Sequence, residues 1–145
     1  MIVRDPNKPL TTPFTDAKPV ILVVTRHGHL TETVMEYSLS VAGRLNHRLL
    51  VAYINTLPFL NDGGLRRKNF SIAVNESTLV LNNLSQKRGV IVSSIKEAGK
   101  VGKVVSRLCR IVKKIEFIIV DKGVKMEEVV LCAPVPVFNV GADTM

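Results

Sequence analysis

The sequence has no tryptophan, only two cysteines, three histidines and few aromatic side chains. Cys109 and Cys132 cannot build a disulfide framework or, by themselves, a four-ligand zinc site. We expect both to be buried, inert thiols and the protein to reside in a reducing cytoplasm. No stretch approaches the ~20 consecutive apolar residues that a membrane helix requires, so the sequence predicts no transmembrane segment.

Acidic residues are also scarce: 12 Asp and Glu stand against 20 Lys and Arg, which leaves a formal net charge of +8 over 145 residues. Such a balance favours acidic partners (nucleic acid, anionic lipid or phosphorylated ligands) without choosing among them. The length fits one domain, residues 19–145, after a Pro-rich flexible leader, residues 1–18, that lacks the apolar region of a secretory signal. An alternative for the leader is a strap that docks Leu10 and Phe14 on the domain surface.

What the chain does contain is a regular alternation of short apolar runs and segments of helical periodicity. The apolar runs predict strands over residues 20–24, 49–54, 90–95, 117–120 and 134–138. The helical periodicity predicts helices over residues 30–48, 65–87, 100–114 and 125–132, with Thr31 as a cap candidate and Gly89 as the stop of the second. This alternation indicates an α/β protein with an open, mostly parallel five-stranded sheet and helices on both faces, a Rossmann-like three-layer sandwich. In such sheets ligands bind beyond the carboxyl ends of the strands, here residues 25–29, 55–64, 95–99 and 121–125.

The stretch from Pro19 to Gly141 resembles the universal stress protein family in the order of its strands and helices. Ala133-Pro134 followed by Pro136-Val137 is similar to the family's Ala-Pro-x-Pro-Val last strand. The resemblance implies the adenine nucleotide alpha hydrolase-like fold and a non-enzymatic regulatory role in stress response and signalling. It also implies pairing of the last strand with its mate across a two-fold axis, because an open apolar edge strand invites association. We therefore expect a homodimer through the residues Val135, Val137, Phe138 and Val140.

The nucleotide site of the family is altered in this sequence. Members that bind ATP carry an Asp at the end of the first strand and a glycine-rich loop after the fourth, whose N–H groups cradle phosphates. Here Arg26 takes the place of the Asp, and only five residues, Asp121 to Lys125, precede the last helix. The resemblance therefore implies a degenerate site and no cofactor. The alternative is a basic site that binds ATP or AMP through Arg26, His27, Gly28, Asp121, Lys122, Gly123 and Lys125.

Arg26-His27-Gly28 also resembles the opening motif of histidine phosphatases. That chemistry requires a second histidine late in the chain, and none follows His47, which we assign to the first helix. Phosphoryl transfer is therefore only a remote alternative, and we expect no enzyme. His27 and His29 have no third ligand at a metal-site spacing, so we expect surface histidines and no metal.

A stripe of basic residues marks the third predicted helix, where no acidic residue lies between Ala98 and Ile115. At about 100° per residue its members fall within a roughly 80° arc. They are Lys100, Lys103, Arg107, Arg110 and Lys114. The stripe is either a solvated face or a surface for an acidic protein partner; nucleic acid is the least supported partner, because no aromatic residues interleave with the charges. A second cluster, residues 66–68, opens the second helix, where cations oppose the helix dipole, so we expect a mobile loop or an acidic partner there.

Overall fold

The computed structural model describes residues 18–57 and 62–140. Its strands are β1 (Val20–Thr25), β2 (Arg48–Asn55), β3 (Val92–Ala98), β4 (Ile115–Val120) and β5 (Val137–Asn139). Its helices are α1 (Glu32–Leu45), α2 (Leu65–Arg88), α3 (Val101–Ile111) and α4 (Met126–Val130). The predicted leader falls almost entirely on residues 1–17, outside the described residues.

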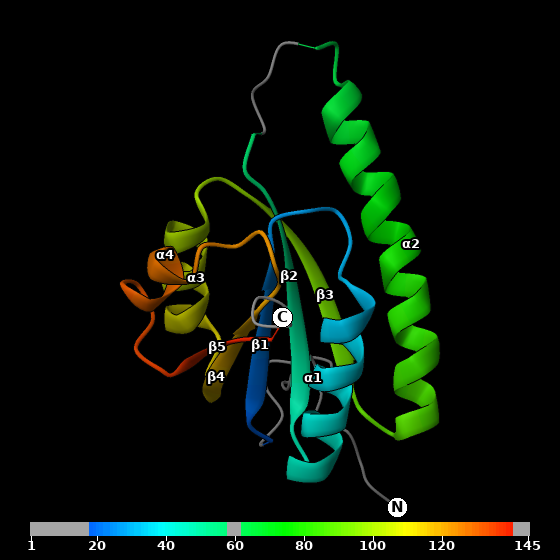
Figure 1. The fold of residues 1–145 in the computed structure, drawn as a ribbon, viewed down its shortest axis with the longest axis vertical. Helices are drawn as coiled ribbons and strands as arrows, with labels where there is room; N and C mark the ends of the chain where they lie inside the picture. The colour runs from blue at the N-terminus through cyan, green and yellow to red at the C-terminus, as the bar shows by residue number, and fades with distance from the viewer. Residues whose placement is uncertain (1–17, 58–61, 141–145) are drawn as a thin grey trace, which may run out of the picture.

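All five strands are parallel and follow the order β3-β2-β1-β4-β5. Helices α1 and α2 cover one face of the sheet, and α3 and α4 cover the other (Figure 1). β1 lies in the centre and is buried along its whole length, which suits its run of β-branched and aliphatic side chains. The predicted α/β fold is therefore confirmed, and the sheet is entirely parallel within the described residues.

The hydrophobic core consists of two layers, one on each face of the sheet. Successive side chains of a strand point to opposite faces, so Leu22 and Val24 pack toward α3 and α4. Ile21 and Val23 pack toward α1 and α2. A strand that feeds both layers fixes its own register, because a shift of one residue would exchange the two sets.

Several boundaries differ from the predicted ones. Thr31 does cap α1, accepting a hydrogen bond from the Val34 N–H, but the helix ends before Asn46, whose φ is 58°, so His47 lies outside it. β3 starts two residues later than predicted because Val90 and Ile91 connect it to the turn at Gly89. β5 is only three residues long. Pro134 and Pro136 have no N–H to donate to a strand ladder, which explains the late start.

The predicted stripe of five basic residues does not form on one helix. α3 ends at Ile111, so Lys100 is its N-cap residue and Lys114 lies in the following turn with φ 68°. Arg107 forms an ion pair with Glu97, which lies just outside the stretch that lacks acidic residues. Within the described ranges, Lys103 and Arg110 are the two helical members of the stripe that form no ion pair.

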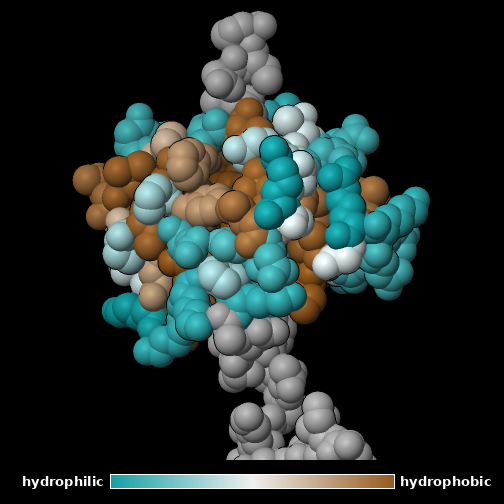
Figure 2. Space-filling model, turned by 90° about the horizontal axis from the view of Figure 1, so that it is seen from below, coloured by the Kyte–Doolittle hydropathy of each residue, from teal (hydrophilic) through white to brown (hydrophobic). Residues whose placement is uncertain are grey.

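The predicted burial of both thiols is also wrong: Cys109 is half-buried and Cys132 is exposed. α4 ends at Val130, so Cys132 lies in the turn beyond the helix instead of on its inner face. Figure 2, which views the molecule from the end where the strands begin, shows hydrophobic residues gathered on the side of α3 and α4. Leu131, which follows α4, is 85% exposed. Among the described helices, none has the length and apolar character needed to cross a membrane.

Candidate functional site

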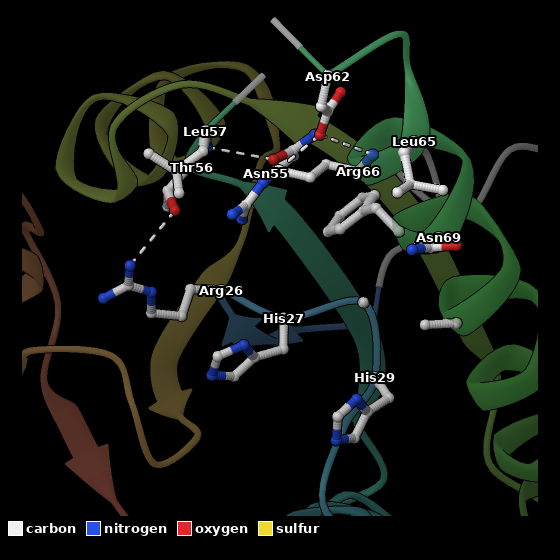
Figure 3. A pocket seen from close by; sticks show the side chains of 13 residues that line it. Arg26, His27, His29, Asn55, Thr56, Leu57, Asp62, Leu65, Arg66 and Asn69 are labelled. Atoms are coloured by element: carbon white, nitrogen blue, oxygen red, sulfur yellow. Dashed lines mark hydrogen bonds and ion pairs between the residues drawn. The ribbon is translucent and has the colours of Figure 1, made fainter. Parts of the chain in front are cut away.

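A cleft of about 760 Å³ opens at the carboxyl ends of the strands. Its walls are the loop after β1, the end of β2 and the first turns of α2, which rise beyond the sheet (Figures 1 and 3). A second cavity of about 420 Å³ shares His27 and His29 with the first and extends to the loop after β4. This second cavity lies between the ends of β1 and β4, where the strand order reverses. Ligands of open α/β sheets bind at such a point. Cavities of about 300–1,000 Å³ are typical of small-molecule sites.

The loop after β1 is shaped by a buried threonine. The Thr25 hydroxyl accepts a hydrogen bond from the His27 N–H at 3.3 Å and donates one to the His29 carbonyl at 3.2 Å. This turn places the two exposed imidazole rings side by side, with centroids 6.1 Å apart and planes at 25° (Figure 3). The expectation of surface histidines is therefore confirmed, and both rings face the two cavities.

Gly28 lets α2 approach this loop more closely than any other residue would. A Cβ atom at Gly28 would lie 2.7 Å from the Ala73 Cβ and 2.8 Å from the Phe70 carbonyl oxygen, both on α2. Such distances require one of the backbones to move. The glycine therefore sets the position of α2, which forms one wall of the cleft.

Arg26 reaches across three loops. Its guanidinium donates to the Thr56 hydroxyl at 3.4 Å and to the Gly123 carbonyl at 3.5 Å. Both contacts are long for hydrogen bonds, so an anion in the cleft would compete with them at low cost. Figure 3 shows the side chain extended beside His27, toward Thr56.

Asp121 is 1% exposed, and its carboxylate is fully engaged. It accepts hydrogen bonds from the Thr31 N–H and hydroxyl, both at 2.8 Å, and from the Lys122 N–H at 2.7 Å. The side chain thus ties the end of β4 to the start of α1. Asp121 borders the second cavity, but its oxygens serve the fold.

The loop after β4 is as short in the structure as in the sequence: β4 ends at Val120 and α4 begins at Met126. Lys122 and Gly123 line the second cavity, whereas Lys125 lines neither cavity. Gly123 has φ 93° and lies against the His27 ring, where an added Cβ would be 3.0 Å from Nε2. The structure therefore gathers all the predicted site residues except Lys125 around the two cavities.

Partial desolvation by the surrounding loops lowers the pKa of His27, and the neighbouring Arg26 and His29 lower it further, while Asp121 opposes them. The cation of His27 is therefore disfavoured in the empty cleft. An anion bound beside the ring would favour protonation, because it adds the negative charge that the surroundings lack.

Sequence reasoning missed the contribution of α2 to the site. Asp62 accepts hydrogen bonds from the N–H groups of Gly64 and Arg66, both at 3.1 Å, and pairs with the Arg66 guanidinium at 3.5 Å. Residues 66–68 lie in the first turn of α2, so the expected loop does not form there, and the Asp62 carboxylate offsets the charge of Arg66. The signal was an Asp placed just before the helix, where its oxygens meet unpaired N–H groups.

The part of the chain that the structure describes holds no group of three or more His, Cys, Asp or Glu residues arranged to bind a metal. Tyr53 is buried beneath the cleft and contacts the Ser77 hydroxyl at 2.9 Å, and burial raises the pKa of this phenol. Ser77 in turn accepts a hydrogen bond from the Leu30 N–H at 3.1 Å. These contacts fasten α2 to β2 and to the loop after β1, so they support the shape of the cleft.

The architecture and the position of the cleft define a parallel α/β protein with a ligand site at the strand ends. Neither a protein-family model nor a curated protein sequence matches the chain. Solved structures do: a universal stress protein from Burkholderia pseudomallei has 18% identity and a TM-score of 0.63, covering 92% of this chain and 100% of that one. The chain thus has the universal stress protein fold, as its sequence resemblance implied.

Two further similar structures are described with a bound nucleotide. The universal stress protein from Archaeoglobus fulgidus in complex with dAMP has 14% identity and a TM-score of 0.61, covering 85% of this chain and 97% of that one. The family protein from Arabidopsis thaliana with AMP bound has 14% identity and a TM-score of 0.62, covering 87% of this chain and 94% of that one.

Proposed function

We propose that this protein is a non-enzymatic regulatory domain whose cleft binds a nucleoside monophosphate such as AMP. The observation that carries the proposal is the pair of adjoining cavities at the strand ends, with Arg26, His27 and Lys122 around them. Proteins of the same fold have been solved with dAMP and with AMP. The cleft favours the basic-site alternative over the degenerate site that the sequence resemblance implied.

The two cavities suit the two halves of a nucleotide. The larger one combines the apolar side chains of Leu57, Leu65 and Phe70 with polar groups, an environment suited to a base and a sugar. The smaller one offers Lys122 and the two imidazoles to a phosphate, and Arg26, which donates to the Gly123 carbonyl at the border of this cavity, lies within reach of the same phosphate. The five residues between β4 and α4 provide few backbone N–H groups, so we propose that a monophosphate fits better than a triphosphate.

The engagement of the nearby carboxylates supports binding without catalysis. Asp62 holds the start of α2, and Asp121 holds the start of α1. Both carboxylates therefore already accept hydrogen bonds from the backbone, which makes each of them a weaker base toward water or a nucleophile in the cleft. The ligand would then act as a signal, and we propose that the protein works in stress signalling in the cytoplasm.

Calorimetric titration of nucleotide-free protein tests this proposal. We expect AMP to bind with micromolar affinity, more tightly than adenosine, because the phosphate contributes the charged contacts. ATP should bind no more tightly than AMP. Arg26→Ala should weaken AMP binding by about tenfold, as expected for the loss of one charge-assisted contact, while Arg44→Ala on the last turn of α1 should leave it unchanged.

If AMP and ATP both produce no heat and the purified protein releases no nucleotide on denaturation, the degenerate-site interpretation holds instead. If Arg26→Ala and Arg44→Ala weaken binding equally, the effect is one of net charge and the cleft is not the site. Equal affinity for adenosine and AMP would remove the role proposed for the phosphate contacts.

Protein partners are the second candidate function. β5 lies at the edge of the sheet, and Phe138 on it is 48% exposed, with its ring perpendicular to that of Phe117 and the two ring centroids 5.5 Å apart. This open edge supports the proposed homodimer through the last strand. The cations of Lys103 and Arg110, which lack ion pairs within the described ranges, support an acidic protein partner at α3.

A further inference from the structure

Helix α2 carries a second apolar stripe on the side turned away from the sheet. Leu65, Ile72 and Leu79 recur every seven residues and are 58%, 46% and 66% exposed. At about 100° per residue the three side chains fall within a roughly 40° arc. Leu81, which is fully buried against the sheet, is nine residues from Ile72 and therefore on the opposite side of the helix.

The outer face of α2 is uncovered in the described structure. Figure 1 shows the helix at the border of the molecule, with α1 and the sheet on its inner side. Single exposed apolar residues are normal on a protein surface, but three that recur along one line of a helix form an ordered apolar stripe, here flanked by Lys68 and Glu76. A seven-residue spacing is that of one of the two apolar positions along which helices pack on each other, and the neighbouring positions here hold the polar residues Lys68, Asn69, Asn75 and Glu76.

The sequence around the stripe is complementary to itself. Leu65 and Leu79 both lie seven residues from Ile72, Lys68 and Glu76 both lie four residues from it, and Asn69 and Asn75 both lie three residues from it. A two-fold axis at Ile72 that pairs two antiparallel copies of α2 would place Leu65 beside Leu79 of the second copy. The same axis places Lys68 level with Glu76 of the second copy. One pair of opposite charges therefore forms on each side of the two-fold axis.

All of these side chains are exposed, and Leu65 and Asn69 also border the cleft at the start of α2. Lys68, Asn69, Asn75 and Glu76 are exposed in the structure. Within the described parts of the chain, neither Lys68 nor Glu76 takes part in an ion pair. Their charges therefore remain free for a contact between molecules.

We propose that the outer face of α2, defined by Leu65, Lys68, Ile72, Glu76 and Leu79, is a self-association surface at which a second copy of this chain packs antiparallel about a two-fold axis at Ile72. An isologous contact of this kind closes on itself and leaves no free end. The segment from Leu65 to Leu79 spans only about 21 Å at 1.5 Å per residue, so the association is weak and depends on concentration. It is separate from the strand-edge dimer, because β5 and β3, which lies next to α2, occupy opposite edges of the sheet.

Sedimentation equilibrium of the full chain in a Phe138→Lys background, which removes pairing through β5, tests the surface. Glu76→Lys should raise the dissociation constant about tenfold, because two attractions become two repulsions in each dimer. Lys68→Glu alone should weaken association similarly. The double variant K68E/E76K should restore it, since each exchanged pair is again opposite in charge.

Arg67→Glu is the matched control, because it makes the same charge change as Lys68→Glu on a face of α2 turned away from the stripe, and it should leave the dissociation constant unchanged. Circular dichroism shows that each variant keeps its fold, which exposed positions permit. A monomeric parent protein at millimolar concentration would overturn the proposal. So would single variants that associate like the parent, or a double variant that does not recover.

Discussion

At the residue scale, the site depends on side chains that serve two loops at once. Thr25 shapes the turn that presents the two imidazoles, and Asp121 ties that turn's exit to the end of β4. Arg26 adds a bridge to the loops after β2 and β4. The loops around the cleft are therefore held by the hydrogen bonds of Thr25 and Asp121, and a bound anion needs to displace only the two contacts of Arg26.

Because the pKa of His27 is lowered in the free protein, the affinity for AMP should depend on pH. Desolvation, Arg26 and His29 disfavour its cation in the free protein, and a bound phosphate raises the pKa again. Because the complex then holds more protons than the free protein, AMP affinity should rise as the pH falls through the pKa of the complex, and level off below that of the free protein.

Calorimetric titrations between pH 8 and pH 5 measure this dependence. His27→Gln, which keeps a polar side chain without an ionisable ring, should remove the contribution of His27 and leave only the change that comes from AMP, whose phosphate has a second pKa of about 6. His47→Gln is the control, because His47 contacts Glu116 and the Leu45 carbonyl, away from the cleft. The same pH profile in the parent protein and in His27→Gln would contradict the role given to His27.

Residues with local roles were predictable, and residues with distant partners were not. Thr31 and Gly89 were identified from the sequence because a helix cap and a helix stop depend on neighbours within one turn. The contact between Asp121 and Thr31 joins residues 90 positions apart, so no local pattern reveals it. The packing of Gly28 on α2 was hidden for the same reason.

At the scale of elements, the position of α2 decides whether the cleft exists. The helix rests on Gly28, and the Ser77 hydroxyl joins it to Tyr53 and to the Leu30 N–H. The length and the C-terminal end of α2 were predicted from the sequence. Because the helix carries apolar residues on two faces, its sequence does not show which face is buried against the sheet. The short α3 is the opposite case: its charges suggested a longer helix, which the extended backbone at Val112 ends.

Substitution of Gly28 tests the packing of α2. Gly28→Ala forces a methyl group against the Phe70 carbonyl and Ala73, and should lower the free energy of unfolding by about 1–3 kcal/mol. Gly43→Ala is the matched control on α1, where the added Cβ meets only Val90 at 3.8 Å. This control should raise the free energy of unfolding by about 0.5–1 kcal/mol, because alanine favours a helix interior over glycine.

Urea denaturation should show a lower free energy of unfolding for Gly28→Ala and a higher one for Gly43→Ala than for the parent protein. An unaltered stability in Gly28→Ala would show that α2 does not rest on the loop as described. AMP affinity of the same variant should also fall, since the methyl group displaces one wall of the cleft.

At the scale of the whole molecule, the fold followed from the sequence more completely than the site did. Alternating strands and helices allow few parallel arrangements, and the five-stranded sheet is the expected one. The strand ends were singled out from the sequence, and the structure has its two largest described cavities there, because the topology alone brings these ends together. The volume and shape of the cleft depend on how far α2 rises above the sheet, which periodicity does not specify.

The most direct test of the nucleotide proposal is a titration of ¹⁵N-labelled full-length protein with AMP, followed by the chemical shifts of its assigned amides. We predict saturable shifts concentrated at residues 26–29 and 121–124 and on the first turns of α2, with smaller changes at the N-terminal ends of the strands. Unchanged spectra at millimolar AMP, or shifts confined to α3 and the far end of the sheet, would contradict the account.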